Sequence, residues 1–241
     1  MVLPDEEIQR ALVVGAHPDD IDFGCVGTVA RWIDAGVAVT YLLVTRGDQG
    51  GFDATPREQM AGLREAEQRA AAKAVGVTDV QFLDGYRDGW VQATPELVKD
   101  ISRVIRQVQP QRMIIQSPER NYDRLPASHP DHMATGDACI RAIYPAARNP
   151  FAFPELLEEE GLQPWTVNEV FIGAHPGASH AVDVTDTFDK KIAALREHVS
   201  QTAHRSEQLE PMVRGWLADQ AKSVGLPEGR LAEVFHIVEL T

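Results

Sequence analysis

Short apolar runs alternate with longer amphipathic stretches along most of the chain. The short runs are rich in β-branched residues and end at glycine or polar residues, which is typical of strands buried in a sheet. We therefore expect strands at residues 11–16, 37–45, 80–83, 112–116, 170–173, 181–184 and 233–240.

The amphipathic stretches carry the start and stop signals of helices. In one of them, Thr55 and Pro56 stand where an N-cap and a first helical residue belong, and Gly76 follows the last turn. Trp32 and Trp216 lie in two of these stretches, and we expect both side chains in the core. The helices are predicted at residues 26–35, 56–75, 94–108, 129–143, 187–202 and 207–224.

This alternation predicts right-handed crossover connections, and hence a mostly parallel sheet with helices on both faces. We expect an α/β fold, a Rossmann-like three-layer sandwich in which residues 1–241 form a single domain. Ligands of such sheets bind beyond the carboxyl ends of the strands. Residues that directly follow the early strands are therefore the first candidates for a functional site.

Composition narrows the class of protein without changing this picture. The 241 residues are 44% hydrophobic and 24% charged, and no apolar run approaches the roughly 20 residues that span a bilayer. The net charge of −13 opposes binding to nucleic acids and anionic membranes, so we expect a small-molecule substrate and leave a homo-oligomer open. The acidic start of the chain and its two cysteines predict a cytoplasmic protein without a disulfide framework.

The first motif with chemical potential, Ala16-His17-Pro18-Asp19-Asp20, directly follows the first expected strand. Pro18 restricts its own backbone and that of His17, which stiffens the loop. His17 and Asp20 could then share a metal ion while Asp19 lies beside it. The motif also has a purely structural interpretation, in which the aspartates cap the next helix and the histidine is a buried polar residue.

A second motif, Ser128-His129-Pro130-Asp131-His132, follows the fourth expected strand and a polar loop. If a helix begins within it, its two histidines lie three residues apart on one helix face. A helix cap and a first-turn carboxylate would also suit this position, and those roles are compatible with metal binding. Because two His-Pro-Asp motifs reach the same edge of the sheet, we favour a joint metal site formed by His17, Asp20 and His132.

Two histidines and one carboxylate leave a coordination position for water, as in catalytic zinc sites. Zinc lowers the pKa of bound water toward ~7 and polarises a carbonyl oxygen. Asp19 would act as the base, His129 would donate to the oxyanion, and Asp131 would orient His129 and keep it protonated. This set predicts a hydrolase for an amide or ester, with Zn²⁺ as the metal and Fe²⁺ or another divalent ion left open.

The two motifs and the intervening Gly24-Cys25-Val26-Gly27-Thr28 resemble the zinc-dependent N-deacetylases related to the glucosaminyl-phosphatidylinositol de-N-acetylase. That family includes bacterial deacetylases of mycothiol and bacillithiol synthesis. The resemblance extends over most of the chain and includes Thr45-Arg46-Gly47-Asp48 and Arg64-Glu65-Ala66-Glu67. It implies removal of an acetyl group from a small N-acetylated amine, an N-acetylglucosaminyl compound.

Carried over residue by residue, the resemblance implies the metal ligands His17, Asp20 and His132, the base Asp19, and the oxyanion stabiliser His129 with Asp131 behind it. It also implies substrate contacts from Arg64 and from Asp48, where relatives more often have glutamate. Some relatives carry a tyrosine two residues before the second motif's first histidine, and this chain has Ala127 there. Apart from the resemblance, Trp90 follows the third expected strand, where it could stack on a sugar ring.

Three alternatives stay open at this point. An amidase for a larger thiol conjugate or a natural-product intermediate would use the same metal chemistry. A non-haem iron oxygenase also uses two histidines and a carboxylate, although its common scaffold is an all-β barrel. A non-catalytic sugar- or nucleotide-binding module would need neither Asp19 nor His129 beside the metal, and the glycines here lack the GxGxxG spacing.

Overall fold

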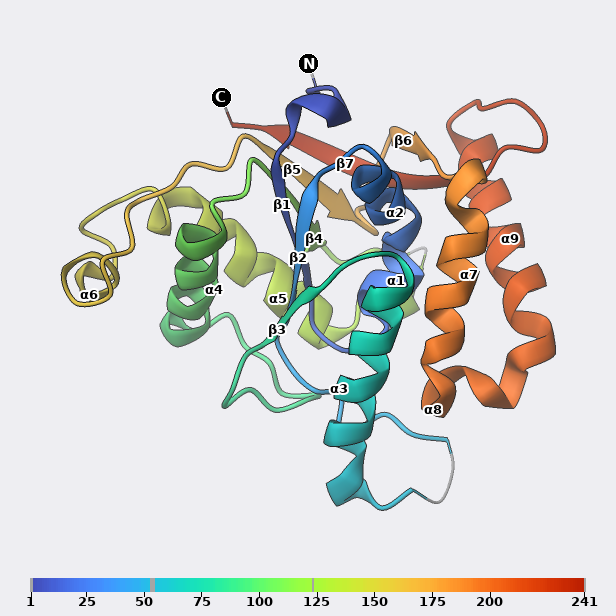
Figure 1. Ribbon diagram of the computed structural model, residues 1–241, viewed down its shortest axis with the longest axis horizontal. Coiled ribbons are helices and arrows are strands. Elements are labelled where there is room, and N and C mark those ends of the chain that lie inside the picture. Colours follow the sequence, from blue (N-terminus) through green and yellow to red (C-terminus); the bar gives the residue numbers. More distant parts are fainter. Residues whose placement is uncertain (1, 53–54, 123, 241) are drawn as a thin grey trace.

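The computed structural model describes residues 2–52, 55–122 and 124–240, which form a seven-stranded sheet with the order β3-β2-β1-β4-β5-β7-β6 (Figure 1). The strands are β1 (Arg10–Gly15), β2 (Ala38–Leu43), β3 (Asp79–Phe82), β4 (Arg112–Gln116), β5 (Glu169–Gly173), β6 (His180–Asp183) and β7 (Ala232–Glu239). Strands β1 to β5 pair in parallel, whereas β7 pairs antiparallel with β5 and β6. The prediction of a mostly parallel sheet is confirmed.

The helices are α1 (Asp20–Gly24), α2 (Val26–Asp34), α3 (Arg57–Ala74), α4 (Pro95–Val108), α5 (Pro130–Arg141), α6 (Pro154–Glu158), α7 (Phe188–Glu197), α8 (Val199–Thr202) and α9 (Ser206–Ser223). One long helix expected at 187–202 is wrong, because it is broken into α7 and α8 at His198. The buried His198 ring contacts Asp22 at 2.8 Å, and its backbone is non-helical. None of the helices in the described ranges is long and apolar enough to cross a membrane.

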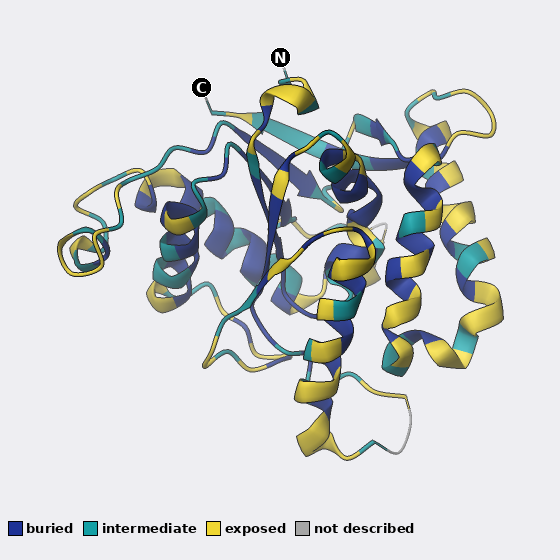
Figure 2. Cartoon of the chain, viewed as in Figure 1, coloured by how far each residue is buried: buried dark blue, intermediate teal, exposed yellow. Residues whose placement is uncertain are grey.

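Alternating strand side chains divide the core into two layers. On β1, Ala11 and Val13 pack toward α2, α3, α7 and α9, whereas Leu12 and Val14 pack toward α4 and α5. Figure 2 shows the strands mostly buried and the outer helix faces exposed. The three-layer sandwich is therefore confirmed, with both faces of the sheet covered as parallel sheets require.

The two predicted core tryptophans behave differently. Trp32 on α2 is 1% exposed and packs edge-on against Phe171, as expected. Trp216 on α9 is 40% exposed, so its placement in the core was wrong. It lines a cavity between α9 and the end of the sheet rather than filling the interior.

A buried ion pair fixes α1 and α2 to the sheet. Lys191 lies 2.8 Å from Glu233 on β7 and also donates to the backbone carbonyls of Asp22 and Phe23 in α1. Glu233 in turn accepts from the Thr28 N–H in the first turn of α2. A buried pair whose charges are all hydrogen-bonded holds its partners in one geometry, because separating them leaves a charge without solvent. The start of α1, which carries the candidate site, is therefore rigidly placed.

Candidate active site

The first motif turns sharply away from the end of β1. Asp19 adopts the left-handed backbone conformation, with φ 84° and ψ −22°, which aspartate tolerates better than most residues. The turn is held by the His17 N–H, which donates to Asp20 Oδ2 at 2.7 Å, and by the Asp19 N–H, which donates to Gln68 Oε1 at 2.9 Å. As a result, Asp19 and Asp20 line different cavities.

The second motif lies at the start of α5, where His129 is the N-cap residue. Helix α5 approaches the end of β4 so closely that a Cβ on Gly136 would overlap the carbonyl oxygen of Gln116. The Gln116 side chain also accepts a hydrogen bond from the backbone of the first motif at 3.0 Å. These contacts hold the two motif loops side by side.

The three histidines of the two motifs form one cluster. The ring centroids of His17, His129 and His132 lie 5.1–5.3 Å from one another. The Asp20 carboxylate bridges two of them, with Oδ1 2.9 Å from His132 Nε2 and Oδ2 3.3 Å from His17 Nδ1. The structure therefore brings together the three residues proposed as metal ligands, and it places His129 beside them.

Two further carboxylates contact His17 rather than His129. Asp131 Oδ2 and Asp88 Oδ1 lie 3.1 Å and 3.0 Å from His17 Nε2. Asp131 also accepts from the backbone N–H groups of Gly89 and Val91. The expectation that the Asp131 carboxylate orients His129 is thus corrected, because this carboxylate instead contacts His17 and the backbone N–H groups of the loop after β3. Sequence reasoning missed Asp88, although it selected Trp90 from the same loop.

These carboxylates determine the charge of the cluster. Burial lowers the pKa of His17, but the charge of Asp20 and hydrogen bonds with Asp131, Asp20 and Asp88 outweigh it and raise the pKa to about 12. Burial alone would raise the pKa of Asp20, yet the charges of His132 and His17 hold it well below its usual value. Imidazole and carboxylate donors surrounded by excess negative charge fit a divalent cation. The cluster could hold such an ion.

Metal binding at this cluster is expected to release protons near neutral pH. His17 is protonated below its raised pKa, and an imidazole must lose that proton before it can coordinate a metal. Zinc titrations by calorimetry in buffers of different ionisation enthalpy should show at least about one proton released per ion. Binding without any buffer dependence of the heat would contradict this prediction.

Asp19 combines burial with a cationic neighbour. Burial raises its pKa, the charge of Arg64 lowers it and that of Asp20 raises it again, with a net value of about 6. The Arg64 guanidinium lies 3.2 Å from Asp19 Oδ2. A pKa slightly below neutral suits a carboxylate that takes up a proton and then returns it.

Arg64, an expected substrate contact, is 4% exposed and holds the site from within. It donates to the carbonyl oxygens of Pro18 and Gly47 at 2.5 Å and 2.8 Å, which ties the loops after β1 and β2 together. Gly47 has φ +63°, and a Cβ there would overlap the guanidinium. Arg64 also lines the polar cavity beside Asp19, although its hydrogen bonds described here are all made to the protein itself.

His129 differs from its expected protonated form. Burial and the charges of His17 and His132 lower its pKa, and the opposing effect of Asp131 is smaller. His129 Nδ1 accepts the backbone N–H of Asp131 at 3.2 Å. This bond selects the neutral tautomer that carries its proton on Nε2. The ring can therefore donate a hydrogen bond without being charged.

A polar cavity of about 290 Å³ opens beside Asp19. It is lined by His17, Asp19, Gln49, Gly50, Arg64, Asp88, Gly89 and His129. The predicted substrate contacts Asp48 and Trp90 are sequence neighbours of this lining, but neither is part of it. Trp90 is 67% exposed, and the Arg87 guanidinium lies 5.6 Å from its ring centroid.

Comparison with known proteins places this site in a family. Residues 12–143 match the family described as GlcNAc-PI de-N-acetylase. The chain is 30% identical over 88% of its length to diacetylchitobiose deacetylase of Thermococcus kodakarensis, of which it covers 77%. It is also 30% identical over 86% of its length to the probable N-acetyl-alpha-D-glucosaminyl L-malate deacetylase 2 of Bacillus cereus, of which it covers 90%.

A solved structure agrees with these sequence relatives. N,N'-diacetylchitobiose deacetylase from Pyrococcus horikoshii has a TM-score of 0.87 and 28% identity to this chain, and the match covers 98% of this chain and 86% of that one. The matched sequence region includes both motifs of the site. The chain belongs to the GlcNAc-PI de-N-acetylase family.

Proposed function

We propose that this member of a deacetylase family hydrolyses the N-acetyl amide of a small N-acetylglucosaminyl compound, with Zn²⁺ held by His17, Asp20 and His132. The convergence of the two His-Pro-Asp motifs on one cluster, with Asp19 beside it, carries the proposal. The relatives reported above are deacetylases of N-acetylated sugars, which supports the same substrate class here.

The residues around the cluster take different roles in the hydrolysis. Bound zinc would supply a nucleophilic water at neutral pH and polarise the amide carbonyl. Asp19 accepts a proton as the water oxygen bonds to the carbonyl carbon, and it returns that proton to the amine nitrogen as the C–N bond breaks. His129 donates from Nε2 to the oxygen that becomes negative. The products are acetate and the free amine.

The polar cavity suits the sugar part of such a substrate. Gln49, Gly50, Arg64 and Asp88 surround it with both donors and acceptors, which sugar hydroxyls require. A pure binding module would not need a carboxylate with a near-neutral pKa at this position. The mostly parallel sheet also argues against a non-haem iron oxygenase, because the common scaffold of that class is an all-β barrel.

Acetate release tests the proposal. Zinc-loaded protein is incubated with N-acetylglucosamine, with N,N'-diacetylchitobiose, and with the N-acetylglucosaminides of inositol and of malate. We expect stoichiometric release of acetate and free amine from at least one of them, and none after chelation of the metal. Protein that binds these sugars and contains zinc but releases no acetate from any of them would contradict the proposal.

A further inference from the structure

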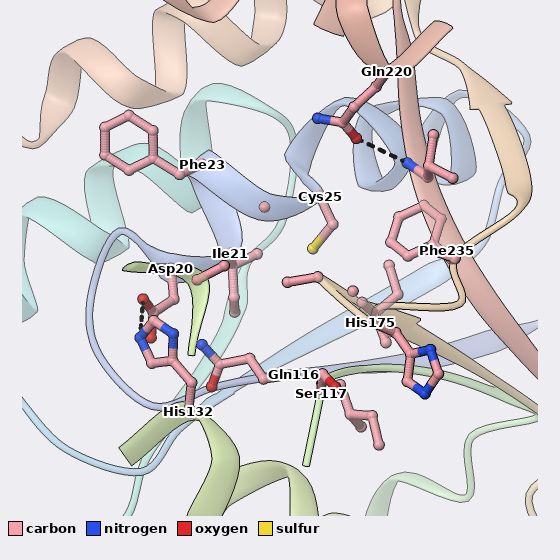
Figure 3. A pocket seen from close by; sticks show the side chains of 18 of the residues that line it. Asp20, Ile21, Phe23, Cys25, Gln116, Ser117, His132, His175, Gln220 and Phe235 are labelled. Atoms are coloured by element: carbon pink, nitrogen blue, oxygen red, sulfur yellow. Dashed lines mark hydrogen bonds and ion pairs between the residues drawn. The ribbon is translucent and has the colours of Figure 1, made fainter. Parts of the chain in front are cut away.

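The backbone turn at Asp19 decides where the proposed base points. Asp19 lines the polar cavity, whereas the next residue, Asp20, lines a separate cavity of about 360 Å³ and contacts His132 in its wall (Figure 3). The left-handed backbone of Asp19, with φ 84°, produces this divergence. Residues other than glycine seldom adopt that conformation unaided, because their Cβ crowds the following carbonyl oxygen. The turn therefore needs an anchor from outside the motif.

Helix α3 holds both ends of the peptide unit that joins Pro18 to Asp19. Arg64 donates to the Pro18 carbonyl oxygen at 2.5 Å, and Gln68 Oε1 accepts the Asp19 N–H at 2.9 Å. Arg64 and Gln68 are four residues apart and therefore lie on one face of α3. A peptide unit is rigid and planar, so bonds at its two ends fix its orientation and, with it, the φ angle of Asp19.

The Gln68 amide must keep one orientation in order to accept this N–H. Its Oε1 atom is an acceptor, whereas its Nε2 atom only donates. Nε2 donates to Asp22 Oδ2 at 2.8 Å, and an ionised carboxylate only accepts. With the amide group reversed, two acceptors would face each other at Asp22 and two donors at Asp19. The Asp22 carboxylate therefore directs the Gln68 oxygen toward the Asp19 N–H.

His198 holds Asp22 in place from the break between α7 and α8. Its Nε2 atom lies 2.8 Å from the same Asp22 Oδ2, and both side chains are fully buried. The break is itself tied to α3, because the N–H and the hydroxyl of Ser200 each donate to the Glu67 carboxylate at 2.7 Å. A buried chain of hydrogen bonds thus runs from His198 through α1 and α3 to the backbone of Asp19.

This chain lowers the stability of the fold at two atoms. Asp22 Oδ1 and His198 Nδ1 are buried and have no hydrogen-bond partner among the described residues. Buried unpaired polar atoms oppose folding, so packing alone would favour apolar side chains here. We infer that Gln68, oriented by Asp22 and His198, is a positioning residue that holds the Asp19 carboxylate in its reactive place. This inference rests on the role proposed above for Asp19.

Gln68→Met removes both hydrogen bonds and keeps an unbranched side chain of similar length. We expect kcat for acetate release to fall about 10- to 100-fold, because a displacement of about 1 Å can cost about 100-fold. The zinc content and KM should stay within about threefold of the wild-type values, since no metal ligand is changed. Wild-type kcat from fully zinc-loaded Gln68→Met protein would overturn the inference and leave the deacetylase intact.

Gln111→Met is the matched control. The Gln111 side chain also accepts backbone N–H groups, those of Gln9 and Arg10, but it lies where β1 and β4 begin, away from the motifs. The same substitution there should leave kcat within about twofold of the wild-type value.

An exchange of the amide and the carboxylate tests whether Asp22 acts through Gln68. Gln68→Glu alone places two carboxylates in contact and should lower kcat at least about tenfold. In the double variant with Asp22→Asn, the asparagine amide donates to the new glutamate, which also accepts the Asp19 N–H. We expect kcat to recover to within about fivefold of the wild-type value. Losses that simply multiply would overturn the inference, because side chains with independent roles behave in that way. Circular dichroism shows whether each variant is folded, and this pair of variants decides the question if Gln68→Met is not.

Crystal structures of the variants separate this inference from the reaction on which it rests. If the wild-type protein hydrolyses none of the sugars, the proposed function fails, and the backbone of Asp19 still decides whether Gln68 positions it. Asp19 should leave its left-handed conformation, with φ 84°, in Gln68→Met and keep it in Gln111→Met. An unchanged Asp19 backbone and carboxylate position in Gln68→Met would overturn the inference whether or not the protein is a deacetylase.

Discussion

Replacing Asp19 by asparagine is expected to lower kcat for acetate release by about 10²–10⁴-fold while leaving the zinc content unchanged. Asparagine has the same shape and also tolerates the left-handed backbone, with φ 84°, that this position requires. It cannot accept a proton, however, so the transfer from water and the return to the amine are both lost. The measurements are kcat and KM by acetate release, together with zinc content by elemental analysis.

Asp84→Asn is the matched control for that variant. Asp84 follows β3 near the site, but its side chain is 90% exposed and pairs with Arg46. The same chemical change there should leave kcat within about twofold of the wild-type value, since substitutions of exposed side chains usually change the stability of a protein little. Asp19→Asn protein with full zinc and wild-type kcat would remove Asp19 as the base. Loss of zinc from that variant would instead make Asp19 part of the metal site.

The candidate site could be located from the sequence because both motifs follow parallel strands, the first directly and the second after a polar loop. Strands β1 and β4 are neighbours, so the residues after their carboxyl ends had to meet at one edge. His17, Asp20 and His132 could therefore be grouped without coordinates. The boundaries of most strands and long helices were also predictable, since they follow periodicity and local capping signals such as Thr94, which accepts the Leu97 N–H at the start of α4.

The partners of the carboxylates were not predictable in the same way. Whether Asp131 faces His17 or His129 depends on backbone donors from the loop after β3, which lie 40 and 42 positions away along the chain. Asp88 belongs to that loop, and its sequence context shows only a turn. Local patterns describe which residues share a face of one element, but they do not fix how a distant loop folds over it.

Two further misses have physical reasons within single elements. Helix α1 is too short to show any periodicity, and it depends on a left-handed residue that is not glycine. Trp216 directly precedes the buried Leu217 on α9, yet it is 40% exposed and lines the cavity between α9 and the end of the sheet. A sequence pattern marks an apolar face without showing whether protein or ligand covers it.

Replacing a metal ligand is expected to cause a large loss of zinc affinity. Two sets of ligands that contain both His17 and His132 are geometrically conceivable: these residues together with Asp20, or the three clustered histidines. A third clustered set, His17 with Asp88 and Asp131, lacks His132. Asp20 contacts both His17 and His132, whereas His129 uses Nδ1 to accept a backbone N–H and needs Nε2–H for the oxyanion. We therefore expect Asp20→Ala and His132→Ala to weaken zinc binding by more than about 100-fold, beyond what loss of an outer partner costs.

His129→Ala distinguishes the two ligand sets. It should keep zinc affinity within about tenfold of the wild type and yet lose about 10²–10³-fold in kcat, because an oxyanion donor is removed and no ligand is. Zinc affinities are measured by competition with a chromophoric chelator, and chelated wild-type protein serves as the reference for folding by circular dichroism. The opposite pattern, with zinc lost from His129→Ala and kept by Asp20→Ala, would show that His129 and not Asp20 is the third metal ligand. It would also leave the oxyanion without the donor proposed here, since the Nε2 atom of His129 cannot serve both.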